Sequence, residues 1–61
     1  MDKNYDLFKE EKGGECVRIE TVRGLTHAKM RIAKLASITP GTYFIYDNEN
    51  GKFIESVKES A

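Results

Sequence analysis

The stretch LASITPGTYFIYDNENGKFI, residues 35–54, decides the fold of this chain of 61 residues. It predicts, in order, a helix end, a Pro-Gly break at 40–41, an apolar strand, a tight turn and a return strand. The Asn-Gly pair at 50–51 is a strong hairpin signal, because both residue types tolerate the left-handed backbone of tight turns. Residues 43–46 are all apolar or amphipathic, which favours an interior strand buried at least partly on both faces.

Before this stretch, apolar residues recur every three or four positions, which is the spacing of an amphipathic helix. Gly24 breaks the preceding strand pattern, and Thr39 is disfavoured in a helix because Pro40 follows it. We therefore expect a helix at about 25–37. Its predicted buried stripe consists of Leu25, Ala28, Ile32, Leu35 and Ala36.

The N-terminal third predicts a second hairpin, with strands at about 4–9 and 16–22 around a charged turn that contains two glycines. Tyr5 and Leu7 are expected on one face of the first strand, because side chains alternate across a sheet. In the second strand, alternation places Val17, Ile19 and Thr21 on one face, and Arg18 and Glu20 on the other.

Together these segments predict an α+β fold of ββαββ order, with strands at about 4–9, 16–22, 42–47 and 52–58. The expected architecture is a four-stranded antiparallel sheet with one helix packed on one face. Residues 1–61 are interpreted as a single domain, since so short a chain holds one core and no more. We find no internal repeat in the sequence.

Residues 24–55 resemble a group of small uncharacterised bacterial proteins with an A-K-x-R-x-x-x-L-A helix, a P-G break, an aromatic strand and an N-G or T-G hairpin. The resemblance implies the same ββαββ layout and no transferable activity. This chain departs from the group at residues 25–27, where Leu-Thr-His replaces the usual acids and leaves the helix more basic. The matching residues are Ala28, Lys29, Arg31, Leu35, Ala36, Pro40, Gly41, Tyr43 to Tyr46, Asn50 and Gly51.

Composition argues against several classes of protein. The lone Cys16 cannot form a disulfide within the chain and suits a reducing compartment, so a cytoplasmic location is expected. No apolar run is long enough to span a bilayer, and charged residues stand where a signal peptide needs an apolar core. We expect no membrane association.

Catalytic and metal signatures are nearly absent. A nucleophilic pair would need Cys16 beside His27, and nothing in the pattern positions them together. These two residues also fall short of the four ligands of a structural zinc site. The chain is therefore expected to be no enzyme, with no catalytic, cofactor-binding or metal-binding residues.

Two weak signals for binding remain. Residues 21–46 contain four bases and no acid, so nucleic-acid binding through a basic helix is one hypothesis. The candidate contacts are Arg23, Lys29, Arg31 and Lys34.

The second signal is aromatic. One helix covers only one face of a sheet, so an aromatic strand is expected to expose side chains on the other face. This favours the leading hypothesis, a small interaction module that pairs with itself as a homodimer, or with a protein partner, through the uncovered sheet face or an edge strand. The candidate interface residues are Tyr43, Phe44, Tyr46 and Phe53.

Overall fold

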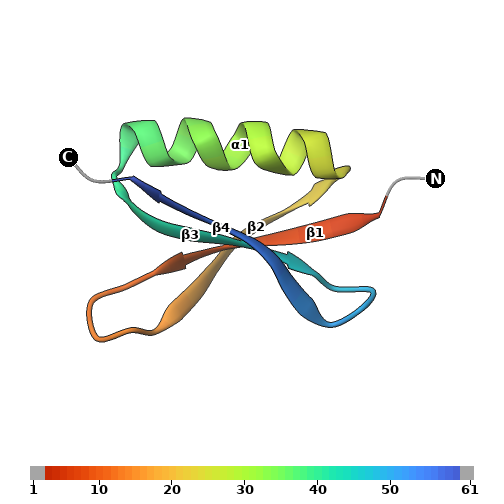
Figure 1. Cartoon of the computed structure of the whole chain (residues 1–61), viewed down its shortest axis with the longest axis horizontal. Helices are drawn as coiled ribbons and strands as arrows, with labels where there is room; N and C mark the ends of the chain where they lie inside the picture. The colour runs from red at the N-terminus through yellow and green to blue at the C-terminus, as the bar shows by residue number, and fades with distance from the viewer. Residues whose placement is uncertain (1–2, 60–61) are drawn as a thin grey trace.

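A computed structural model describes residues 3–59, and in this part of the chain it contains one four-stranded antiparallel sheet and one helix. The predicted α+β class and ββαββ order are confirmed, and every bound lies within one residue of the expected one. The strand order is β2-β1-β3-β4, so the two hairpins meet at the central pair β1 and β3 (Figure 1). The elements are β1 (Asn4–Glu10), β2 (Cys16–Arg23), α1 (Leu25–Ile38), β3 (Gly41–Asp47) and β4 (Lys52–Glu59).

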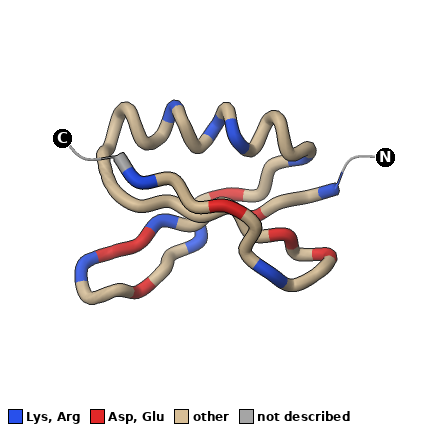
Figure 2. Tube along the Cα trace, in the orientation of Figure 1, with Lys and Arg blue, Asp and Glu red and all other residues tan. Residues whose placement is uncertain are grey.

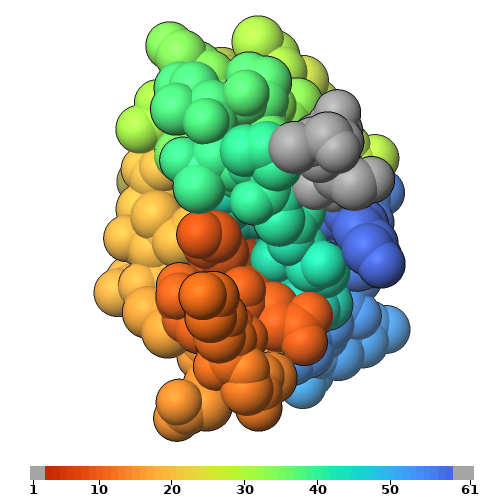
Figure 3. All heavy atoms as spheres, turned by 90° about the vertical axis from the view of Figure 1, so that its left-hand side faces the viewer, coloured from red at the N-terminus to blue at the C-terminus, as the bar shows by residue number. Residues whose placement is uncertain are grey.

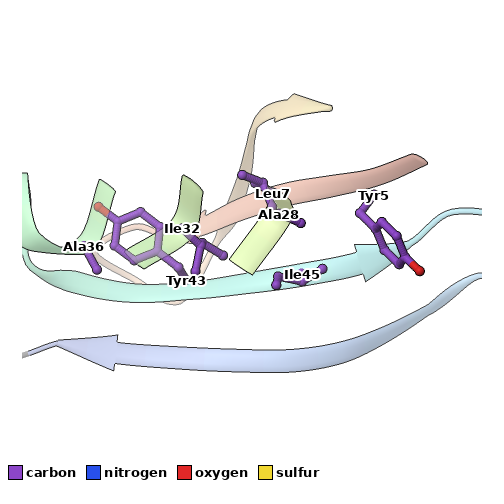
Figure 4. Packing of buried hydrophobic residues seen from close by; sticks show 7 residues of the cluster. All are labelled: Tyr5, Leu7, Ala28, Ile32, Ala36, Tyr43 and Ile45. Atoms are coloured by element: carbon purple, nitrogen blue, oxygen red, sulfur yellow. The ribbon is translucent and has the colours of Figure 1, made fainter. Parts of the chain in front are cut away.

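The core lies between α1 and one face of the sheet (Figures 1 and 4). Ala28 and Ala36 are small, which allows the helix to lie close to the strands, and Ile32 fills the space between them. Leu25 and Leu35 pack partly buried at the margin of this core. The fully assembled apolar cluster comprises Tyr5, Leu7, Ala28, Ile32, Ala36, Tyr43 and Ile45.

The predicted alternation along β2 is wrong beyond its midpoint. Pairing with β1 shifts register between Leu7 and Phe8, and Ile19 is the extra residue of a β-bulge. The bulge changes which face each later side chain takes. Glu20 and Val22 therefore lie on the helix side, opposite Leu7 and Tyr5, whereas Thr21 and Arg18 lie on the other face.

A second bulge occurs at the equivalent point of the second hairpin. The register of β3 with β4 shifts between Ile45 and Tyr46, where Ile54 is the extra residue. Leu7 faces Ile45 across the central strand pair. A two-fold axis between these two residues therefore relates the two hairpins to each other, bulges included, and Figure 1 shows their symmetric crossing beneath α1.

This symmetry corrects the expectation that the chain has no internal repeat. The axis superposes the β2 sequence IETVR, residues 19–23, on the β4 sequence IESVK, residues 54–58. It also superposes the β1 sequence YDLF, residues 5–8, on the β3 sequence YFIY, residues 43–46. The two hairpins are thus two versions of one structural unit.

Candidate interaction surface

The face of the sheet turned away from α1, called the underside below, carries four aromatic side chains that contact one another. Phe53 lies at the centre of this aromatic patch, with ring centroids 4.9 Å from Tyr46, 5.7 Å from Phe8 and 5.8 Å from Phe44, all edge to face. Phe8 and Tyr46 also pack edge to face, at 5.9 Å. Such geometry is favourable for aromatic pairs. Phe53 nevertheless remains 53% exposed.

Three of the four predicted sheet-face residues, Phe44, Tyr46 and Phe53, lie together on the underside. The prediction for Tyr43 is wrong, because this side chain points to α1 and is only 2% exposed. Alternation explains the difference, since Tyr43 and Ile45 share the helix side and their neighbours take the other. Phe8 was missed, although the inward positions of Tyr5 and Leu7 already imply that Phe8 points outward.

Beside the aromatic patch, β1 and β2 hold a polar network around Asp6. The carboxylate accepts hydrogen bonds from Thr21 Oγ1 at 2.6 Å, Arg18 Nε at 3.3 Å and Asn48 Nδ2 at 3.3 Å. Arg18 also donates to Thr21. The bond from Thr21 is the largest cause that lowers the pKa of Asp6 below 3.8; burial opposes it, and Asn48 and Arg18 reinforce it.

The internal two-fold axis permits a direct comparison of the two hairpins. Their helix-facing positions are alike in kind: Tyr5 corresponds to Tyr43, Leu7 to Ile45, Glu20 to Glu55 and Val22 to Val57. Their underside positions differ at two places. Asp6 corresponds to Phe44, and Arg18 corresponds to Phe53. The same fold is therefore built with a charged pair in one hairpin and with two aromatic rings, of which Phe53 is exposed, in the other.

Three of the predicted basic residues, Lys29, Arg31 and Lys34, lie on α1, on the opposite side of the sheet from the aromatic patch, and Figure 2 shows only basic charges along α1. Arg31 Nε lies 2.7 Å from Glu20 Oε2 of β2, and Lys29 Nζ lies 3.6 Å from Glu55 Oε1 of β4. Acids from both outer strands thus neutralise two of the four predicted contacts. Arg23 and Lys34 are exposed, at the end of β2 and on α1.

Cys16 and His27 are not brought together. Cys16 begins β2 and His27 follows its end, so the length of an eight-residue strand, about 20 Å, separates them. The His27 ring instead lies 3.3 Å from the Arg23 carbonyl oxygen. Among residues 3–59 there is no pocket and no cluster of three metal-ligating side chains. In this same range, no helix has the length and apolar character needed to cross a bilayer.

Comparison of the chain with models of known protein families, with curated proteins and with solved structures finds no match.

Proposed function

We propose that this protein is a non-enzymatic interaction module that binds a protein partner through the aromatic patch. The observation that carries the proposal is the exposure of Phe53 at the centre of that patch, where the first hairpin has Arg18 instead. Because the first hairpin folds without an aromatic residue at that position, the fold does not require one there. An exposed aromatic cluster that the fold does not require is typical of a binding surface.

The sheet edges are less suitable than the underside. Both edge strands carry a bulge, β2 at Ile19 and β4 at Ile54, and bulges interrupt the regular ladder that an added strand would need. The proposal therefore uses the face of the sheet rather than strand addition.

Nucleic-acid binding through α1 remains the second candidate, and the geometry supports it less. Single-stranded nucleic acid is bound where basic groups and stacking aromatic rings share one surface. Here Lys29 and Arg31 pair with acids on the helix side, while the aromatic rings lie on the underside. Arg23 and Lys34 would have to supply the phosphate contacts.

We also propose a cytoplasmic location. Cys16 is a free and exposed thiol, which suits a reducing compartment.

The proposal is tested by photo-crosslinking in the source cells. A photoreactive phenylalanine analogue is placed at position 53, or at position 30 as the matched control. Met30 is 64% exposed on α1, so both positions are open to solvent and differ in the surface they report. We expect the probe at position 53 to give a higher yield of protein adducts than the probe at position 30. We also expect Phe44→Asp to suppress the adducts formed from position 53.

Equal adduct yields from the two positions would overturn the proposal. Adducts from position 30 that contain nucleic acid, with none from position 53, would favour the second candidate instead.

A further inference from the structure

We infer that the partner of the aromatic patch is a second copy of this chain, packed underside to underside about a two-fold axis. This inference rests on the proposed function and specifies the occupant of the same surface. Three properties of the surface support it: its shape, its charges and the order of side chains along its strands.

Shape is the first property. The sheet is strongly twisted (Figure 1), and both hairpin loops lie at the end of the molecule away from α1 (Figures 1 and 3). Two sheets of the same twist pack well face to face when their strands stay nearly aligned. An identical sheet, which necessarily has the same twist, is therefore a well-shaped partner for this underside.

Charge is the second property. The chain carries 10 acidic and 10 basic residues, so two copies do not repel each other through net charge. The underside of the first hairpin carries Arg18, whose side chain is 57% exposed, beside Asp6. A surface that holds both signs is able to complement itself across a two-fold axis.

The order of side chains along the strands then selects the axis. An axis parallel to the strands would place Arg18 of one copy over Ser56 of the other, where no acid lies in the row. An axis across the strands places β3 and β4 of one copy on β3 and β4 of the other, so that Phe44 lies over Tyr46, and it places β1 and β2 on β1 and β2. Because this axis reverses the strand direction, it also sets Arg18 of each copy over the row that holds Asp6 and Thr21 in the other.

The size of the surface fixes the expected strength. Four strands of about seven residues present a face of about 440 Å², so two copies bury about 900 Å² in total. Stable specific interfaces bury about 1,200 Å² or more. The dimer is therefore expected to be weak and concentration-dependent, and the test must extend to about 1 mM protein.

The first experiment measures the mass of the purified full chain by sedimentation equilibrium and light scattering, from about 10 µM to about 1 mM. We expect the weight-average mass to rise from that of one chain towards that of two. The disruptive variant is Phe44→Asp with Phe53→Arg, which installs in the second hairpin the residues that Asp6 and Arg18 supply in the first. Since the first hairpin folds with those residues, the variant should keep the wild-type circular dichroism spectrum and remain a monomer at every concentration.

A single substitution, Phe53→Ser, serves if the double variant does not fold, and it should weaken self-association at least tenfold. The second control is Met30→Ser on α1, which should self-associate as the wild type does because Met30 is exposed on the opposite side.

The arrangement is tested by isotope-filtered NMR on a mixed labelled and unlabelled sample. We expect intermolecular contacts between Phe44 and Tyr46 rings, which face each other when the strands are reversed. Contacts from these rings to Met30, or to Ile19 at the β2 edge, would overturn the face-to-face arrangement.

A wild-type chain that stays monomeric at 1 mM would overturn the inference about the second copy. The cross-linking result separates this failure from failure of the proposed function. Adducts of position 53 with a different protein would leave the interaction module standing with another partner, whereas equal yields from positions 53 and 30 would remove both.

Discussion

The hydroxyl of Tyr43 lies 3.3 Å from the carbonyl oxygen of Leu35. Its single proton is shared between this oxygen and the nearer carbonyl oxygen of Thr39, just beyond the end of α1. The Leu35 carbonyl oxygen also accepts the Thr39 amide at 2.8 Å, and α1 has no basic side chain in its last turn that could bind its other end carbonyls. Tyr43 therefore secures the C-terminal end of α1 to the strand that follows, while its ring fills the core.

Replacing Tyr43 by Phe should lower the free energy of unfolding by about 0.5–1.5 kcal/mol, because the ring stays and the hydrogen bonds are lost. For a domain of this size, each kcal/mol corresponds to about 4–8 °C in melting temperature. Thermal unfolding followed by circular dichroism measures the change. The matched control is Tyr46→Phe on the underside, which should melt as the wild type does; equal melting of all three proteins would contradict the capping role.

Replacing Ile32 by Ala should cost about 2–5 kcal/mol, because the side chain is 1% exposed and its removal leaves a cavity against the sheet. A domain of this length has about 3–9 kcal/mol of stability in total, so this variant loses a large part of it. Leu35→Ala should cost less, since Leu35 is only partly buried. Urea unfolding measures both. Met30→Ala is the surface control, and a variant at Ile32 as stable as this control would contradict the helix register.

Local patterns were sufficient to predict most of the fold. The stripe of α1 and the break at Pro40 fixed the helix, because burial against a sheet demands a helical period of apolar residues. The Asn50-Gly51 pair fixed the second turn, where Gly51 has a φ of 68°. These features depend on neighbours in the sequence, and the expected bounds are correct to within one residue.

The bulges and the repeat were not predicted, because both depend on pairing between segments that are distant in the sequence. A bulge adds one residue to one strand and reverses the faces beyond it, so simple alternation misplaced Thr21 and Glu20. The two hairpins also have loops of different length, residues 11–15 and 48–51, which hides the repeat from a search at one fixed spacing. The aromatic patch was predicted in part: Phe44, Tyr46 and Phe53 lie in it, whereas Tyr43 points to α1 and Phe8 was missed.

Acid should destabilise the protein through Asp47, which closes the second turn. Burial acts to raise its pKa. That effect is outweighed by the hydrogen bonds that the carboxylate accepts from the Asn50 side chain, from the Asn50 and Glu49 amides and from Lys3. The pKa of Asp47 therefore lies below 3.8. A carboxylate with a lowered folded-state pKa stabilises the fold above its unfolded value of about 3.9, and this contribution is lost as the pH falls through the folded value. The free energy of unfolding should therefore decrease from about pH 5 to about pH 2, and Asp47→Asn should make that decrease shallower.

Urea unfolding at several pH values measures the slope. Glu49→Gln removes one carboxylate from the same exposed turn and is the control for net charge, so it should keep the wild-type slope. Parallel curves for Asp47→Asn and the wild type would contradict the assignment.

A negative charge in the first turn of α1 should stabilise the fold. This turn begins after Gly24 with no side-chain cap and contains no acid, although the N-terminal end of a helix favours negative charge. Thr26 is exposed in that turn, and Thr26→Glu should raise the free energy of unfolding by about 0.3–1 kcal/mol at low salt. Thr26→Gln is nearly the same size without the charge, so the difference between the two variants isolates the electrostatic part. That difference should vanish at about 1 M salt, where screening acts over about 3 Å. Identical urea midpoints for the Glu and Gln variants at low salt would show that the bare amides of this turn exert no such attraction.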